Sequence, residues 1–227
     1  MNVISVVLPV YRNAEALAAL HARLIRVLEA EAAAFELIFV DDACPAGSGA
    51  VLDELARQDA RVRIIRHERN QGQRLAVWHG LEAARGGVVI AMDADLQDPP
   101  EAIPLLLVEL RSTGAGAVFA GRRGAYQGRL RMATSRLYRS VLQALTGIPG
   151  DAGSFVAMTR GAVDRILPIS MPSPYLPALL ASTGLPVHSI PVERDTRPAG
   201  QSAYSEWARL RLAYNGLSAA WKLKRRG

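Results

Sequence analysis

The sequence predicts an α/β fold in which a mostly parallel sheet lies between layers of helices. Within residues 1–121, short apolar segments alternate with amphipathic segments that are long enough to form helices. Strands separated by such helices pair in parallel through right-handed crossovers. Of the 227 residues, 50% are hydrophobic, which is enough for one sizeable core.

The expected elements follow one another in a regular order. Apolar runs bounded by turn-forming residues predict strands at 3–11, 35–42, 61–67, 88–93 and 115–121. Helical periodicity lies between them at 14–33, 48–59, 73–85 and 100–112. The pattern then changes: an Arg-rich helical stretch at 128–146 leads to "GDAGSFVAM" (150–158). A short helix, the Pro-rich segment "LPISMPSPYLPALL" (167–180) and a further strand at 185–193 follow.

No internal repeat or low-complexity linker divides the chain. We therefore expect one domain over residues 1–203, with halves at 1–121 and 122–203, followed by an amphipathic basic helix at 204–227. Its single cysteine, Cys44, excludes an internal disulfide and fits a reducing compartment. The first residues lack a basic leader, and no run reaches the ~18–20 apolar residues of a membrane span. We expect a soluble or peripheral protein.

The segment "VVIAMDADLQDPPEAI" (88–103) carries four acidic residues, Asp93, Asp95, Asp98 and Glu101, directly after a buried run. Carboxylates this close repel one another unless a cation lies between them. Asp93 and Asp95 share one face of a strand, and Gln97 adds an oxygen at the same spacing. This all-oxygen set favours Mg²⁺ or Mn²⁺. An acid-rich helix N-terminus is the alternative, and it accounts only for Asp98 and Glu101.

Polar groups follow three of the predicted strands: Pro9 to Tyr11, the pair Asp41 and Asp42, and the DAD run. Carboxyl ends of parallel strands meet at one edge of a sheet, where ligands bind. The chain has neither G-x-G-x-x-G nor the P-loop signature. A nucleotide would therefore be held by a metal and by side chains. A net charge of +6 suits an anionic partner, although a rim of carboxylates argues against nucleic acid.

Several motifs together resemble family 2 glycosyltransferases of the GT-A fold, in the branch of dolichyl-phosphate mannose synthases and undecaprenyl-phosphate sugar transferases. The motifs are "VVLPVYRN", "LIFVDDA", "RNQGQRLAVWHGLEAARG", "VVIAMDADLQDPPEAIP", "AGRRGAYQGRLRMATSRLYR", "DAGSF" and "RPAGQSAYS". The resemblance covers nearly the whole chain. Members of this branch often continue into membrane-spanning helices, and we expect this chain to lack that part.

The resemblance implies a role for each matching residue. Pro9, Tyr11 and the backbone of Val40 would surround the nucleotide base, and Asp42 would meet the base or ribose. Asp93, Ala94, Asp95 and Gln97 would surround the metal and the diphosphate. Asp95 and Asp151 would be catalytic. Arg122 and Arg197 would contact the donor, while the acceptor phosphate would be met by Arg122, Arg123 and Arg136.

The residues themselves leave other interpretations open. Tyr11 could be an ordinary strand-end aromatic, and Asp41 and Asp42 could be turn formers. Asn70 and Gly72 could contact the ligand directly, or could simply shape a loop and cap the helix. The arginine cluster could be a solvated helix face. No histidine shows a metal-ligand spacing.

The implied activity is inverting, metal-dependent transfer of a sugar from a UDP- or GDP-sugar to a polyprenyl phosphate at the inner face of the membrane. One rival is a soluble or glycan acceptor. Another is a non-catalytic nucleotide-sugar-binding subunit of a membrane complex, since Val156 and Ala203 stand where the family has Arg and Lys. The predicted last helix carries an apolar stripe that comprises Trp207, Leu210, Tyr214, Leu217 and Trp221. This stripe would lie at a membrane interface, or it would dock on the core, on a second subunit or on a small membrane protein.

Overall fold

A computed structural model of the chain describes residues 3–31, 34–123, 147, 149–169 and 171–195. Arg136, Arg197, Ala203 and the helices expected at 128–146 and 204–227 lie outside these residues. For Arg122 and Arg123 the structure describes the backbone alone.

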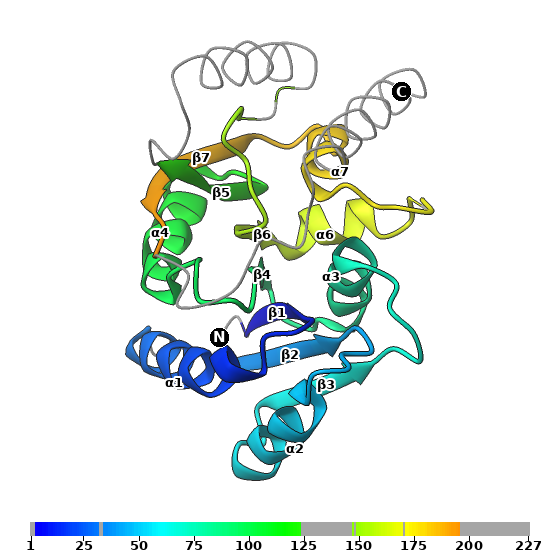
Figure 1. Cartoon of the computed structure of the whole chain (residues 1–227). Helices are drawn as coiled ribbons and strands as arrows, with labels where there is room; N and C mark the ends of the chain where they lie inside the picture. Colours follow the sequence, from blue (N-terminus) through cyan, green and yellow to red (C-terminus); the bar gives the residue numbers. More distant parts are fainter. Residues whose placement is uncertain (1–2, 32–33, 124–146, 148, 170, 196–227) are drawn as a thin grey trace, which may run out of the picture.

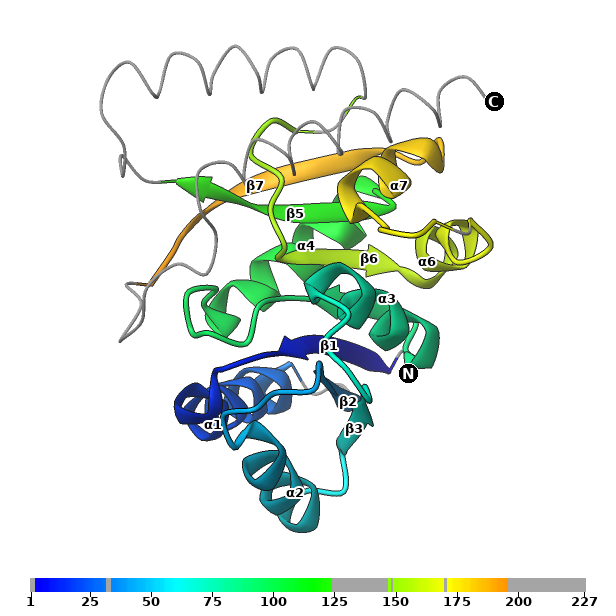
Figure 2. The same cartoon turned by 45° about the vertical axis from the view of Figure 1, so that its right-hand side comes forward.

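The centre of the fold is a seven-stranded sheet with the order β3-β2-β1-β4-β6-β5-β7 (Figures 1 and 2). Its strands are β1 (Ile4–Val10), β2 (Phe35–Asp41), β3 (Val62–Arg66), β4 (Val88–Ala91), β5 (Ala117–Arg123), β6 (Val156–Thr159) and β7 (Val187–Glu193). Strands β1 to β4 are parallel, as are β5 and β7, whereas β6 runs antiparallel to both of its neighbours. The mostly parallel sheet is therefore confirmed.

The carboxyl-terminal ends of six strands lie at the same edge of this sheet. Strand β6 is antiparallel to both β4 and β5, so β5 and β7 run in the same direction as β1 to β4. Strand β6 therefore begins at the edge of the sheet where the other strands end. We call this the carboxyl edge. It brings together the segments that follow β1, β2 and β4, and the segment that precedes β6.

Helices cover both faces of the sheet (Figure 1). They are α1 (Ala14–Ala30), α2 (Ser48–Gln58), α3 (Gln73–Ala83), a 3₁₀ turn η1 (Pro100–Ala102) leading into α4 (Ile103–Thr113), α6 (Arg160–Ile166) and α7 (Leu176–Ser182). One apolar cluster packs α1, α2 and α4 on one face, and a second packs α3, α6 and α7 on the other. Every residue of β1 and β2 is buried, as expected for strands covered on both faces.

The helix α7 is an element for which the sequence analysis made no prediction. It lies in a proline-rich segment, and Pro177 lies at the start of the helix, where its missing N–H costs nothing. Among the described residues, none of the helices has the length and apolar composition to cross a membrane.

Candidate active site

Tight turns follow three strands at the carboxyl edge. Arg12 after β1, Ala43 after β2 and Leu96 after β4 have positive φ angles of 60°, 53° and 63°. This left-handed backbone conformation is unfavourable for residues other than glycine, by about 1–3 kcal/mol, and it persists where surrounding contacts impose it.

A side-chain oxygen stabilises each of these turns. Asn13 Oδ1 accepts a hydrogen bond from the Tyr11 amide at 2.8 Å, and Asp41 Oδ1 accepts one from the Cys44 amide at 3.0 Å. Asp95 Oδ1 accepts one from the Gln97 amide at 3.1 Å. The turn-forming role that the sequence left open for Asp41 is therefore the one the structure has. Three strained loops held in this way give the edge a defined shape.

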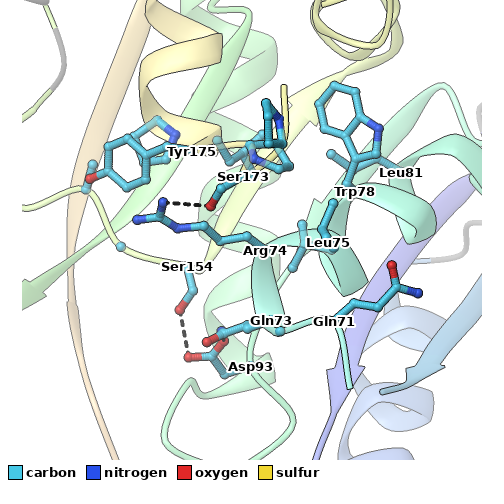
Figure 3. A pocket seen from close by; sticks show the side chains of 18 residues that line it. Gln71, Gln73, Arg74, Leu75, Trp78, Leu81, Asp93, Ser154, Ser173 and Tyr175 are labelled. Atoms are coloured by element: carbon cyan, nitrogen blue, oxygen red, sulfur yellow. Dashed lines mark hydrogen bonds between the residues drawn. The ribbon is translucent and has the colours of Figure 1, made fainter. Parts of the chain in front are cut away.

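Asp93 lies where three parts of the chain meet. Its Oδ1 accepts a hydrogen bond from Gln73 Nε2 at the start of α3, and its Oδ2 accepts one from Ser154 Oγ at 2.8 Å, just before β6 (Figure 3). The side chain keeps 20% of its surface exposed. Two neutral donors orient this carboxylate, and its Oδ2 also faces a guanidinium, that of Arg194.

Arg194, directly after β7, is the cation that lies among the carboxylates of the DADLQD segment. Its Nε donates to Asp98 Oδ1 at 2.7 Å, and its Nη1 donates to Gln97 Oε1 at 3.1 Å. Its Nη2 is 3.8 Å from Asp93 Oδ2. Asp98 is only 3% exposed, so this arginine compensates a buried charge.

A second arginine holds the same loop from α1. Arg23 forms two hydrogen bonds with Glu101, at 3.0 and 2.5 Å, and one with Asp195 at 2.9 Å. Hydrogen bonds from Arg23, the largest influence, lower the pKa of Glu101. Arg194 thus connects the end of β7 to the acidic loop after β4. Arg23 connects α1 to the acidic loop through Glu101 and to the end of β7 through Asp195.

The predicted metal ligands are Asp93, Asp95 and Gln97. In the described part of the chain, no cluster of three or more His, Cys, Asp or Glu side chains is arranged to hold a metal ion. Mg²⁺ and Mn²⁺ sites that also bind phosphates need only one or two carboxylates, and the oxygens of Asp93 and Asp95 fit that donor set. Gln97 Oε1 instead accepts a hydrogen bond from Arg194.

Asp42 is buried at 2% exposure and organises the loop before α3. Its Oδ1 accepts hydrogen bonds from His67 Nδ1 at 2.7 Å and from the Gln71 amide at 2.8 Å. Its Oδ2 accepts one from the Gly72 amide at 2.8 Å. His67 Nε2 in turn lies 2.8 Å from His79 Nδ1. The carboxylate thereby fixes the loop that presents Gln73 to Asp93.

The remaining residues predicted around the nucleotide differ in their exposure. Pro9 and Val40 are paired in register on β1 and β2 and are buried, and Ala94 is 1% exposed. Tyr11 is 41% exposed at the end of β1, with the Arg12 guanidinium 5.5 Å from its ring centre. Tyr11 is thus the member of this set whose side chain a ligand can reach.

Asp151 lies against β5. A Cβ atom at Gly121 would collide with Asp151 Oδ2 and would come within 2.5 Å of Ser189 Oγ on β7. A Cβ at position 121 would therefore displace the Asp151 carboxyl group or the Ser189 hydroxyl group. Arg122 and Arg123 are the next two residues of β5, so their backbone reaches the same carboxyl edge.

An open pocket of about 700 Å³ adjoins Asp93. We call it the α3 pocket. One wall is α3 with the loop before it, and the other is the segment 172–177. Asp93 and residues 152–154 also line it, and Figure 3 shows Ser154 and Asp93 together on one side of the cavity. The pocket thus connects the acidic site with a more apolar space.

Comparison with known proteins agrees with this architecture. The sequence profile of glycosyl transferase family 2 matches residues 5–167. The chain belongs to this family. It is 31% identical over 217 residues to the uncharacterized glycosyltransferase YkcC of Bacillus subtilis, covering 94% of this chain and 67% of that protein. It is 34% identical over 221 residues to an undecaprenyl-phosphate 4-deoxy-4-formamido-L-arabinose transferase of Pseudomonas fluorescens, covering 96% and 64%.

Solved structures confirm that this family 2 chain has the GT-A fold. Glucosyl-3-phosphoglycerate synthase from Mycobacterium tuberculosis, in complex with Mn²⁺, UDP and phosphoglyceric acid, aligns with a TM-score of 0.69 and 19% identity, over 98% of this chain and 78% of its own. A mannosyltransferase from Pyrobaculum calidifontis, in complex with GDP-Man and Mn²⁺, aligns with a TM-score of 0.68 and 18% identity, over 99% and 64%. The chain spans about two thirds of the length of its sequence relatives.

Sequence reasoning missed three residues of this site: Arg194, Gln73 and Ser154. For the first, the sequence held only a general signal: the clustered acidic residues require a cation, but the sequence does not indicate which one. Gln73 and Ser154 lie inside quoted motifs, but only the fold shows that both contact Asp93.

Proposed function

We propose that this family 2 glycosyltransferase is inverting and metal-dependent, and that it moves a sugar from a UDP- or GDP-sugar to a polyprenyl phosphate. The observation that carries the proposal is the position of Asp93, which joins the acidic loop at the carboxyl edge to the α3 pocket. The relatives named as undecaprenyl-phosphate transferases support the acceptor class, and the nucleotide complexes of the similar structures support the donor class.

On this proposal Asp93 and Asp95 hold Mg²⁺ or Mn²⁺, and Ala94 and Gln97 belong to the same diphosphate site. When bound, the metal ion would stabilise the negative charge that develops on the leaving nucleoside diphosphate. Gln73 and Ser154 keep the Asp93 carboxylate oriented, and Arg194 holds Gln97 and Asp98 so that the loop does not open under the repulsion of its own charges.

The base would lie against Tyr11, with Pro9 and the backbone of Val40 behind it. Asp42 would meet the base or ribose. Its carboxylate already accepts three hydrogen bonds from the 67–72 loop, so we propose that it acts mainly by fixing that loop.

The acceptor phosphate has a second pKa near ~6, so it is already largely ionised at neutral pH. Its oxygen forms a bond to the anomeric carbon while the bond from that carbon to the diphosphate oxygen breaks, and the nucleoside diphosphate leaves with the electron pair. This nucleophile needs positioning more than it needs a base. We propose Arg122, Arg123 and Arg136 for the acceptor phosphate, Arg122 and Arg197 for the donor, and Asp151 beside the reacting centre.

The organisation of the rest of the chain is part of the same proposal. Residues 1–121 would form the nucleotide-binding half and residues 122–203 the acceptor half. The helix that the sequence predicts at 204–227 would meet the inner face of the membrane or a protein partner. The basic end of the chain, Lys222, Lys224, Arg225 and Arg226, supports contact with anionic lipid.

The test is calorimetric titration of UDP and of GDP, with Mn²⁺ and with EDTA, on the wild type and on Asp95→Ala. We expect metal-dependent binding of one nucleotide that the substitution abolishes, while Asp164→Ala, on the exposed side of α6, binds as the wild type does. The matching nucleotide sugars are then assayed for transfer to farnesyl phosphate. Absence of nucleotide binding under every condition would overturn the proposal, whereas nucleotide binding without transfer to any acceptor would favour a non-catalytic nucleotide-sugar-binding subunit. Transfer only to a soluble acceptor would overturn the lipid-phosphate part.

A further inference from the structure

We propose that the Arg194 guanidinium is an internal counter-ion of the metal site. It competes with the metal ion for Gln97 and for the Asp93 carboxylate, so that a metal ion binds tightly only together with a nucleoside diphosphate. This inference rests on the proposed function and deepens it, because it assigns control of metal binding to a residue at the end of β7, outside the acidic loop.

The contacts of Arg194 differ in length. Those with Asp98 are the shortest, because Nε donates to Oδ1 at 2.7 Å and Nη2 lies 2.6 Å from the same oxygen. Nη1 donates to Gln97 Oε1 at 3.1 Å, and Nη2 faces Asp93 Oδ2 at 3.8 Å. Arg194 is thus anchored on Asp98, and its contacts with Gln97 and Asp93 can break while that anchor stays.

Gln97 and Asp93 are also two of the predicted metal ligands. A divalent ion held by them would lie close to the guanidinium, and the two cations would repel each other. The side chains of Arg194 and Asp98 are only 17% and 4% exposed, so water screens this repulsion incompletely. A metal ion that binds alone therefore loses part of its binding free energy in turning the guanidinium away.

The backbone keeps Arg194 beside the acidic loop after such a turn. The Asp195 amide donates to the Gln97 carbonyl oxygen at 3.0 Å, so the end of β7 is joined to the loop without the guanidinium. A guanidinium released from Gln97 would then meet the oxygens of a bound diphosphate. The negative charge of the diphosphate compensates both cations, so the nucleotide and the metal ion should each tighten the binding of the other.

The sign of the change in metal affinity separates this role from a purely structural one. Mn²⁺ binding to the full chain is measured by electron paramagnetic resonance without nucleotide. We expect Arg194→Gln to bind Mn²⁺ about tenfold more tightly than the wild type, whereas Arg194→Lys, which keeps the positive charge, stays within about threefold. Arg111→Gln, which removes the same charge from the last turn of α4, is the matched control and should change nothing.

An arginine that only kept the loop in shape would give the opposite result, because its loss would weaken Mn²⁺ binding. Weaker or equal affinity in Arg194→Gln would therefore overturn the inference. The absence of Mn²⁺ binding in the wild type and in every variant would overturn it as well.

A second measurement uses the wild type, so it does not depend on the stability of any variant. In a nuclear magnetic resonance titration with Mg²⁺, the side-chain amide of Gln97 should shift together with the backbone amide of Asp95, with one apparent dissociation constant. A shift of the Asp95 amide that leaves the Gln97 side chain unchanged would refute the competition.

Nucleotide titrations then separate this inference from the proposed function. The factor by which UDP or GDP tightens Mn²⁺ binding should be about tenfold smaller in Arg194→Gln than in the wild type. An undiminished factor would overturn the inference and leave the proposed function standing. If neither nucleotide binds, the proposed function fails, and the Mn²⁺ affinities measured without nucleotide decide the role of Arg194.

Discussion

Arg194 Nη2 lies 2.6 Å from Asp98 Oδ1, and the two side chains are only 17% and 4% exposed. This ion pair connects the end of β7 to the acidic loop after β4, two segments that are almost a hundred residues apart in the sequence.

Removing the arginine should be costly, because it leaves the Asp98 carboxylate buried without a cation. We expect Arg194→Gln to lower the free energy of unfolding by about 3 kcal/mol, measured by urea denaturation. The double variant Arg194→Gln/Asp98→Asn should recover part of this loss, because it also removes the stranded charge. Equal stability of Arg194→Gln and the exposed-site variant Arg111→Gln would show that the pair contributes nothing.

The contact between Asp42 and the 67–72 loop predicts a local effect on backbone dynamics. In Asp42→Ala both carboxylate oxygens are removed, so the amides of Gln71 and Gly72 both lose their acceptor. We expect amide hydrogen exchange at these two positions to become at least about tenfold faster, corresponding to the loss of about 1–2 kcal/mol per hydrogen bond. Amides of β1 serve as the internal control. Unchanged protection at both positions would contradict the role assigned to Asp42.

The close approach of Asp151 to Gly121 predicts a steric effect. Gly121→Ala should displace the aspartate and reduce sugar transfer by at least about tenfold. Gly161→Ala in α6 is the matched control, because its Cβ would meet no atom within 4 Å. That variant should keep its activity and gain about 0.5–1 kcal/mol of stability. Full activity of Gly121→Ala would show that Asp151 is not needed where the structure places it.

Asp59 should contribute to stability in a pH-dependent way. Hydrogen bonds from Arg61, the largest influence, lower the pKa of Asp59 to about 2, and His21 also hydrogen-bonds to it. A carboxyl group with a lowered pKa in the folded state stabilises the fold above its unfolded pKa, and this contribution is lost as the pH falls toward about 2. We expect Asp59→Asn to be less stable than the wild type at pH 6, by about 1–2 kcal/mol because Arg61 is near the surface, with the difference closing between pH 4 and pH 2. The comparison is made by denaturant unfolding at each pH, with Asp164→Asn as the exposed control. A difference that stays constant over this range would refute the assignment.

Periodicity alone determined much of the first half of this protein. The alternation of apolar strands with amphipathic helices predicted β1 to β5 and α1 to α4 to within a few residues, because each element buries one regular stripe or run of side chains. The expected convergence of strand ends follows from parallel pairing, and the structure brings Tyr11, Asp42 and Asp93 to one edge. The sequence motifs likewise indicated the family that the comparisons confirm.

Only the tertiary structure decided which groups meet at that edge. The reversal of β6 carries Ser154 to Asp93, and β7 carries Arg194 to Asp98, and no local pattern predicts either pairing. Asp42 illustrates the same limit: its motif suggested a ligand contact, but in the fold its oxygens accept hydrogen bonds from His67, Gln71 and Gly72. The physical reason is that hydrogen bonds and charge compensation act between atoms close in space, whereas the sequence records only which residues are neighbours along the chain.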